Sequence, residues 1–208
     1  MDSKKKQLVA REAEAPHIGD LRARWRAWQR EVASGRLVFI DEAGSHIAMT
    51  REYARAPIGK RTSDTVPRNR GTVTTILGGL TRDGLVATMT IEGGTDGDVF
   101  AVFLDEVSGP HLTDGDLVVM DNAGSHKDPR VRTILAKYGS KPVYLPPYSP
   151  ELNPIELAWS KLKGFLRTTK ARTVPALNEA SGLGMTVITP QDAGNWSRRC
   201  GYRDGHAT

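Results

Sequence analysis

Two short runs of apolar residues each end directly in an aspartate, and this pattern constrains the fold more than any other feature of the chain. Leu37–Ile40 is followed by Asp41, and Leu117–Met120 is followed by Asp121. Uninterrupted apolar runs of this length are typical of strands that helices cover on both faces. Because sites in open α/β sheets form beyond the carboxyl ends of strands, we expect the two aspartates to belong to one site.

The remaining patterns predict an α/β fold with a mixed sheet flanked by helices. A β-hairpin is predicted for residues 72–80 and 85–91, because the turn between them contains Asp83-Gly84. Alternating strands and helices in the second half favour parallel pairing there. Further strands are expected at 49–61, with its turn, and at 142–145, and helices at 21–32, 98–107, 129–138, 154–167, 174–183 and 190–200. Gly78-Gly79 and Gly93-Gly94 are interpreted as turn or strand-end features.

The charge of the chain weakly favours a polyanionic partner such as DNA. The net charge is +5 and the isoelectric point is about 9.4. Between Lys161 and Arg172 the sequence has five basic residues and no acidic one. We therefore name as candidate DNA contacts Arg68, Arg70, Lys161, Lys163 and Arg167, although a merely solvated basic surface explains the same residues.

The absence of cysteine pairs, of a signal region and of a membrane span predicts the cellular compartment. Cys200 is the only cysteine, which excludes an internal disulfide and fits a reducing environment. Residues 1–11 are rich in lysine and carry no apolar signal region, and no apolar run is long enough to span a membrane. We expect a cytoplasmic protein without a membrane partner.

Three carboxylates are candidates for a metal site. Asp41 and Asp121 would repel one another unless a cation lay between them, and Glu156 at the start of a helix offers a third ligand. Each residue also has a plain structural explanation. An aspartate after a strand is often a turn or cap residue. In Asn153-Pro154-Ile155-Glu156, the asparagine fits a helix N-cap and the glutamate fits its capping-box partner.

Three local sequences resemble the signature segments of bacterial insertion-sequence transposases of the mariner superfamily. They are Phe39-Ile40-Asp41-Glu42, the segment from Val118 to Lys127 (VVMDNAGSHK) and the segment from Leu145 to Glu156 (LPPYSPELNPIE). Thirty-four residues separate Asp121 from Glu156, as in the Asp, Asp, Glu triad of that superfamily. The resemblance extends from about Arg36 to Arg172, and residues 192–202 also look like the end of such proteins.

The resemblance implies an RNase H-like domain in which Asp41, Asp121 and Glu156 bind two Mg²⁺ or Mn²⁺ ions. Such an enzyme frees the 3′ ends of a mobile element by hydrolysis and joins them to target DNA, so its partners are element ends, target DNA and, we expect, a second copy in a homodimer. Both steps are in-line displacements that need no covalent protein nucleophile. Asn122 and His126 are auxiliary candidates that would orient a phosphate or a metal-bound water, or would simply build the loop after Asp121.

The predicted organisation has three parts: a basic tail and amphipathic helix (1–35), the catalytic domain (36–172) and a helical extension (173–208). Members of the family normally carry helix-turn-helix domains before the catalytic domain, and thirty-five residues are too few for two of them. We therefore expect that recognition of element ends is absent or lies on a separately encoded helix-turn-helix protein.

Two alternatives to an active enzyme are considered. One is an inactive transposase remnant that binds DNA or dimerises through Trp25 and Trp28 or its C-terminal helices, and so regulates a full-length transposase. The other is a phosphotransferase that uses Asp41 as its nucleophile in an all-parallel sheet. The Asp-Gly hairpin argues against the second alternative.

Overall fold

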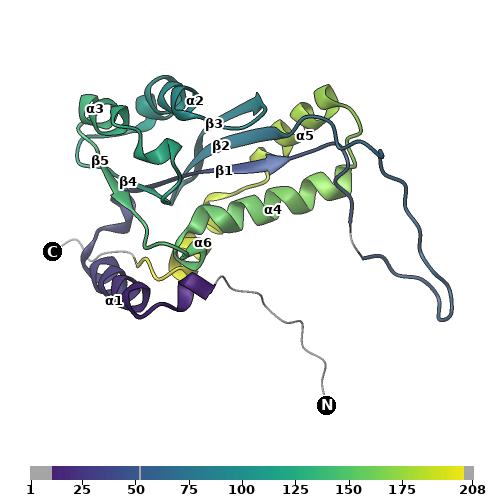
Figure 1. Ribbon diagram of the computed structural model, residues 1–208, viewed down its shortest axis with the longest axis horizontal. Coiled ribbons are helices and arrows are strands. Elements are labelled where there is room, and N and C mark those ends of the chain that lie inside the picture. Colours follow the sequence, from purple (N-terminus) through teal and green to yellow (C-terminus); the bar gives the residue numbers. More distant parts are fainter. Residues whose placement is uncertain (1–10, 52, 204–208) are drawn as a thin grey trace, which may run out of the picture.

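A five-stranded mixed sheet forms the centre of the molecule, with helices on both of its faces (Figure 1). The computed structural model describes residues 11–51 and 53–203. The strand order is β3-β2-β1-β4-β5. The strands are β1 (Leu37–Ser45), β2 (Thr74–Thr81), β3 (Gly84–Glu92), β4 (Leu117–Met120) and β5 (Lys141–Tyr144).

Both kinds of strand pairing predicted from the sequence are present. Strand β2 pairs antiparallel with β1 and with β3, and β4 pairs parallel with β1 and with β5. The predicted mixed sheet is therefore confirmed. The all-parallel sheet expected for the alternative phosphotransferase is not formed. The antiparallel part follows from the tight turn between Thr81 and Gly84, where Gly84 has a φ of 115°.

Alternating residues of β1 bury their side chains in two separate cores. Leu37 and Phe39 belong to the core on one face, and Val38 and Ile40 belong to the core on the other face. This alternation explains why the strand is apolar throughout. Both faces of the central strands are covered, so their carboxyl ends are held firmly in place.

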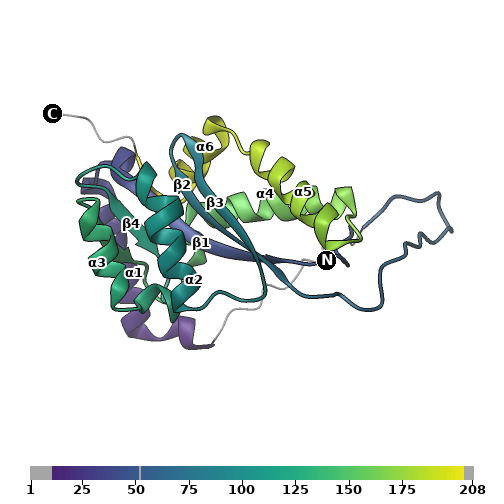
Figure 2. The same cartoon turned by 90° about the horizontal axis from the view of Figure 1, so that it is seen from above.

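The helices divide between the two faces of the sheet (Figures 1 and 2). One core contains side chains of α2 and α3, and the other contains side chains of α1, α4, α5 and α6. All the predicted helices are present, and α2 continues into a π-helical segment at Phe103–Ser108. Their bounds are α1 (Pro16–Glu31), α2 (Gly97–Val102), α3 (Arg130–Lys137), α4 (Pro154–Thr169), α5 (Val174–Thr186) and α6 (Pro190–Arg199).

The predicted strand at 49–61 is wrong. The described residues between β1 and β2 form no strand, and this connection projects from the body of the protein as an extended arm (Figure 1). Residues 53–63 are exposed and carry no alternation of apolar and polar side chains that would bury one face. The arm is fastened at its base, where Arg172 Nη1 donates hydrogen bonds to the carbonyl oxygens of Ile47 and Met49 at 2.9 and 2.8 Å.

Gly78 and Gly79 were interpreted as turn or strand-end residues, and this interpretation is also wrong. Both lie inside β2, where Gly78 pairs with Asp41 of β1. The ring of Trp159, on α4, lies directly over Gly78: a Cβ atom at Gly78 would come within 2.6 Å of the ring. Glycine is therefore required at this position because α4 packs closely on the sheet. Gly93, by contrast, does follow the end of β3 and has a φ of 96°.

The first helix and the last described residues pack against the same core. Trp25 and Tyr202 are buried together, and the Trp25 Nε1–H donates a hydrogen bond to Tyr202 Oη at 3.1 Å. Residues of all three predicted segments thus contribute to the core on the α4 face of the sheet. Trp25 is only 8% exposed and is buried within its own chain. No helix in the described part of the chain is long and apolar enough to cross a membrane.

Candidate active site

The parallel pairing of β1 and β4 brings Asp41 and Asp121 together. The register pairs Phe39 with Val119. Two residues further along, the same register places Asp41 beside Asp121. Because side chains alternate along a strand, both carboxylates lie on the face of the sheet that α4 covers. Asp121 directly follows β4 as predicted, but the prediction that the first strand ends at Asp41 is wrong: β1 continues to Ser45 because residues 41–45 pair with β2.

Asp41 is a buried carboxylate. Its side chain is 8% exposed; Oδ1 accepts a hydrogen bond from the backbone N–H of Glu42 at 2.9 Å, and Oδ2 accepts one from Asn153 Nδ2 at 3.4 Å. The pKa of Asp41 is raised to about 7, chiefly by burial and then by the negative charges of Glu156 and Asp121, while the Glu42 hydrogen bond acts to lower it. The Asp41 carboxylate thus lies among other negative charges in a site that favours a cation.

Asp121, which directly follows β4, has a different environment from its neighbour Asp41. Its side chain is 51% exposed, and Oδ1 accepts a hydrogen bond from the backbone N–H of Ala123 at 2.8 Å. His126 Nδ1 lies 2.6 Å from the same oxygen. This contact with His126 is the main reason that the pKa of Asp121 is lowered. Asp121 is therefore held ionised by a neighbour rather than kept neutral by burial.

Glu156 lies in the first turn of α4 and faces the cavity that Asp121 also lines. The cavity has a volume of about 470 Å³, and its other wall is the proline-rich segment 145–150. Burial, and then the charge of Asp121, raise the pKa of Glu156, while Lys163 lowers it. The three carboxylates predicted from the sequence therefore meet at one end of the sheet, near enough for their charges to interact.

The predicted capping box at the start of α4 is not formed. Asn153 occupies the N-cap position and Pro154 is the first helical residue, but the side chain of Asn153 makes no capping hydrogen bond. Its amide nitrogen contacts Asp41 instead, and its buried Oδ1 has no hydrogen-bond partner. The glutamate side chain is thus left available to the cavity.

His126 connects the two faces of the sheet and was not given this role by the sequence. The ring is completely buried; Nε2 lies 3.0 Å from Glu42 Oε2 and the ring contacts Phe100 at a centroid distance of 4.4 Å. Burial acts to lower the pKa of His126, but the hydrogen bonds to Asp121 and Glu42 outweigh it and raise the pKa to about 9. His126 is therefore a cation between two carboxylates, away from solvent.

Glu42 is the residue of this arrangement that the sequence analysis missed. It follows Asp41 and therefore points to the opposite face of β1, where His126 lies. Because side chains alternate along a strand, the adjacent residues Asp41 and Glu42 indicated that each face of the sheet carries one carboxylate there. Asn122, the other auxiliary candidate, donates a hydrogen bond from Nδ2 to the carbonyl oxygen of Leu145 at 2.6 Å, so its side chain helps to build the loop.

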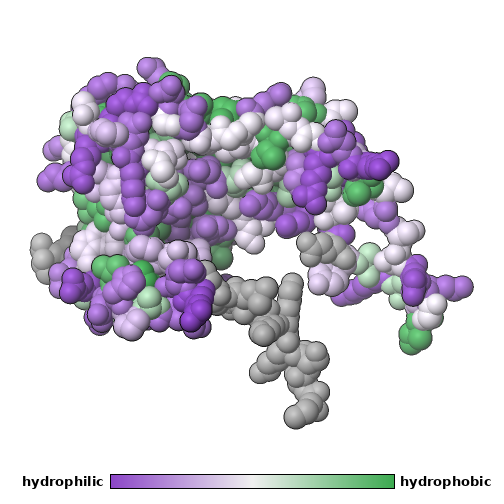
Figure 3. Space-filling view, in the orientation of Figure 1, coloured by the Kyte–Doolittle hydropathy of each residue, from purple (hydrophilic) through white to green (hydrophobic). Residues whose placement is uncertain are grey.

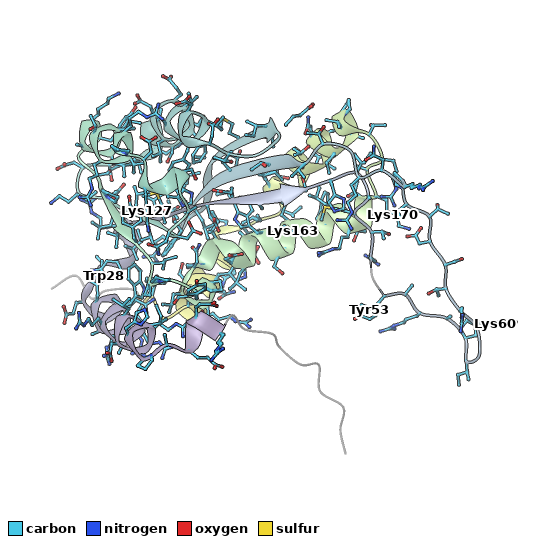
Figure 4. The ribbon with its side chains drawn as sticks, in the orientation of Figure 1. Trp28, Tyr53, Lys60, Lys127, Lys163 and Lys170 are labelled. Atoms are coloured by element: carbon cyan, nitrogen blue, oxygen red, sulfur yellow. The ribbon has the colours of Figure 1, made fainter. Side chains whose placement is uncertain are left out.

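The basic candidates for DNA binding differ in their surroundings. Lys161 Nζ lies 2.6 Å from Asp192 Oδ2 and also donates to the carbonyl oxygen of Val187, contacts that tie α4 to α6. Lys163 lies nearer the site, on the middle of α4 with Lys170 at the end of that helix (Figure 4). The face in view is largely hydrophilic, as a surface for a polyanion would be (Figure 3).

The other basic candidates lie away from the three carboxylates. Arg167 lines a separate cavity beneath the arm together with Arg51 and Tyr53. Arg68 and Arg70 are exposed on the arm, and the charge of Arg70, together with burial, lowers the pKa of His46.

The donor set at the site fits hard divalent cations. It consists of carboxylate oxygens and the unpartnered amide oxygen of Asn153, the ligand types that Mg²⁺ and Mn²⁺ prefer. In residues 11–51 and 53–203 no three acidic, histidine or cysteine side chains close around a common point as ligands do around an ion.

Comparison with known proteins identifies relatives of the chain by sequence family and by fold. A family model described as DDE superfamily endonuclease matches residues 36–178. No curated protein matches the sequence. The fold is similar to a Mos1 transposase paired-end complex with the left transposon end, with a TM-score of 0.75 and 15% identity over 97% of this chain and 64% of that one.

Two further solved structures show the same similarity. A Mos1 mariner paired-end complex with Mn has a TM-score of 0.73 and 16% identity, covering 100% of this chain and 68% of that one. The isolated catalytic domain of Mos1 mariner transposase has a TM-score of 0.63 and 11% identity, covering 95% of this chain and 93% of that one. The chain thus spans about two thirds of the longer transposase chains and nearly all of the catalytic domain.

Proposed function

The chain belongs to the DDE superfamily endonucleases, and from this premise we propose that it is the catalytic domain of a transposase that cuts DNA strands and joins the freed ends to a target. The proposed element is a bacterial insertion sequence of the mariner superfamily, and the proposed setting is the cytoplasm. Its substrates are the element ends and the target DNA. A homodimer and a separately encoded helix-turn-helix protein are the proposed partners.

The observation that carries this proposal is the convergence of three carboxylates beside two parallel strands. Asp41 and Asp121 are brought together by the strand register, and Glu156 shares a cavity with Asp121. Burial, and then the charges of neighbouring carboxylates, raise the pKa of Asp41 and of Glu156. An arrangement in which acidic groups are kept close despite repulsion is typical of a cation site.

Asp41, Asp121 and Glu156 are the residues that would hold two Mg²⁺ or Mn²⁺ ions. When bound, such ions activate the attacking oxygen and stabilise the leaving oxygen of an in-line displacement at phosphorus. The chain's own contribution is to orient the ligands. Asp41 is oriented by Glu42 N–H and by Asn153, and Asp121 by Ala123 N–H and His126.

The surroundings of the triad support DNA as the substrate. Lys163 lies near enough to Glu156 for its charge to lower the pKa of that carboxyl, so it is well placed to attract a phosphate. The wall formed by residues 145–150 contains Pro146, Pro147 and Pro150, which restrict the backbone and give the cavity a fixed shape. His126 is completely buried, so it acts as a positioning residue and does not contact the substrate.

The proposal is tested by nicking of supercoiled plasmid DNA in the presence of Mn²⁺. Asp121→Asn should reduce nicking to the rate without protein, because the substituted amide removes one anionic metal ligand from the site. Asp20→Asn is the matched control, since Asp20 is exposed on α1 and outside the site. Equal nicking by wild type and Asp121→Asn would overturn the assignment.

Thermal unfolding with and without Mn²⁺ separates an active enzyme from an inactive remnant. A ligand that binds only the folded state raises the melting temperature. We expect Mn²⁺ to stabilise the wild-type protein and the Asp20→Asn control, and to stabilise Asp121→Asn less. Absence of any Mn²⁺ effect on the wild type would favour the remnant.

A further inference from the structure

Five arginines from both ends of the described chain line one cavity that the proposed reaction does not use. The cavity has a volume of about 710 Å³ and lies between α1, α6 and the segment that follows α6. The arginine cluster consists of Arg26, Arg30, Arg198, Arg199 and Arg203. The only acidic residue in its lining is Glu151.

The charges of the arginine cluster are not neutralised within the described part of the chain. Glu151 already lies 3.5 Å from another arginine, Arg22 Nε. Arg198 donates a hydrogen bond to the side-chain oxygen of Asn195 at 2.6 Å, which is a neutral partner. No ion pair within residues 11–51 and 53–203 involves any member of the cluster. Like charges gathered without counter-charges raise the free energy of the folded state unless an anion binds.

The cluster is held in place by a rigid framework. Gln29 Nε2 donates to the carbonyl oxygen of Cys200 at 3.0 Å, and Trp25 Nε1 donates to Tyr202 Oη at 3.1 Å. These buried bonds fix α1 against the end of α6, although the residues they join are more than 170 positions apart. The helix dipole favours positive charge in the last turns of α1 and α6, where Arg30, Arg198 and Arg199 lie, but it does not account for Arg26 and Arg203.

A single turn separates the arginine-lined cavity from the cavity that Asp121 and Glu156 line. Glu151 and Leu152 line the arginine cavity, whereas Pro150, Asn153 and Glu156 line the catalytic cavity. The turn between them spans Pro150–Leu152, and Tyr202 Oη donates to the carbonyl oxygen of Leu152 at 2.8 Å. A polyanion that occupies the catalytic cavity therefore needs to extend only past this turn to reach the arginines.

We propose that the arginine cluster binds the phosphate backbone of the DNA duplex whose strand enters the catalytic cavity. The inference rests on the proposed function, because DNA must be the substrate for the duplex to pass the turn. Guanidinium groups bind phosphate oxygens in pairs through parallel N–H donors. Five of them around a cavity of 710 Å³ match several phosphates along a strand better than a single small anion.

The test is equilibrium binding of a fluorescent 30-base-pair duplex, measured without metal so that no cleavage occurs. Arg30→Gln/Arg199→Gln removes two charges from the cluster, one from each helix. Its control is Arg24→Gln/Arg132→Gln, which removes two exposed arginines that do not line the cavity. We expect the first variant to bind on the order of tenfold more weakly near 150 mM salt. The slope of log K against log salt should fall by about 2, because each lost phosphate contact removes about 0.9.

Each outcome bears on the proposal. Weaker binding and a smaller salt slope in the cluster variant alone support it, provided that both double variants melt at the wild-type temperature. Equal affinities in the two variants, or no binding of DNA by the wild type, overturn it. Binding of inorganic phosphate that the cluster variant loses, with unchanged DNA affinity, would also overturn it and would indicate a small-anion site. Mn²⁺-dependent nicking by the wild-type protein tests the proposed function separately from this metal-free binding assay, so failure of this inference is distinguishable from failure of the proposed function.

Discussion

Asp41 of β1 and Asp121, which follows β4, lie side by side in the sheet but have opposite electrostatic environments. Asp41, inside β1, is buried and its pKa is raised to about 7. Asp121 at the end of β4 is half exposed and its pKa is lowered by His126. The difference shows that strand register decides where an acidic group lies, while the neighbours on the adjoining loops decide its protonation state.

The largest effect on this contrast should come from removing the positive charge between Glu42 and Asp121. His126→Gln removes the buried cationic ring that contacts both Glu42 and the half-exposed Asp121. We expect a loss of about 2 to 4 kcal/mol in unfolding free energy, because breaking such a pair leaves uncompensated charge. Nicking with Mn²⁺ should fall about tenfold to a hundredfold, as is usual when a residue that orients a metal ligand is lost.

The matched control for that substitution is His111→Gln, since His111 is exposed. Chemical denaturation and plasmid nicking are measured on both variants. If His126→Gln unfolds and nicks like His111→Gln, then the contact with His126 does not determine the properties of Asp121.

A smaller effect should follow from moving the Glu156 carboxylate relative to Asp41 and Asp121. Gly78→Ala places a methyl group within 2.6 Å of the Trp159 ring, so α4 must shift away from the sheet. Overpacking of this kind costs about 1 to 3 kcal/mol. Because Glu156 lies one turn before Trp159 on α4, we expect nicking to fall about tenfold and half-saturation to require more Mn²⁺.

Gly94→Ala is the control for this substitution, because a Cβ at Gly94 meets no atom within 4 Å. A Mn²⁺ titration of the nicking rate distinguishes the variants. An unchanged titration for Gly78→Ala would mean that the height of α4 above the sheet does not set the position of Glu156.

A pH dependence of stability should also distinguish Asp41 from the group around Asp121. The pKa of Asp41 is raised from 3.8 to about 7, so the folded state binds this proton more tightly than the unfolded state. Metal-free protein should therefore lose stability as the pH rises from about 4 to 7. Asp41→Asn removes this titration, so its melting temperature should exceed that of the wild type by several degrees at pH 7.5 and by less at pH 4.5.

His126 provides the second pH window. Its pKa is raised from 6.5 to about 9, so its contribution is complete below pH 6.5 and is lost as the pH rises through 9. This decline should persist in Asp41→Asn and disappear in His126→Gln. Melting curves from pH 4 to 10 for the three proteins check both pH ranges in which stability is lost. A single common range would show that Asp41 and His126 do not titrate separately.

The sequence predicted the elements that depend on local pattern. The two apolar runs, the Asp-Gly hairpin and the helix after Pro154 are all found, and with them the mixed sheet. Each of these features arises from residues that are neighbours in the chain, so periodicity and turn chemistry are enough to identify them. The convergence of Asp41 and Asp121 followed from the expected parallel pairing.

The sequence did not reveal features that depend on partners distant in the chain. The contact of Glu42 with His126 joins residues 84 positions apart, and Gly78 owes its place in β2 to Trp159. Lys161 was named as a candidate DNA contact because no acidic residue lies near it in the sequence. Its ion-pair partner, Asp192, lies on another helix. The arm between β1 and β2 was assigned a strand although no face of it is buried.

The Tyr202 hydroxyl has a consequence for truncation. It accepts a hydrogen bond from Trp25 and donates one to the carbonyl oxygen of Leu152, next to the turn that borders the catalytic cavity. A fragment trimmed to residues 36–172 would lose both aromatic rings and leave this carbonyl unsatisfied. We therefore expect such a fragment to be less stable than one that spans α1 to Tyr202.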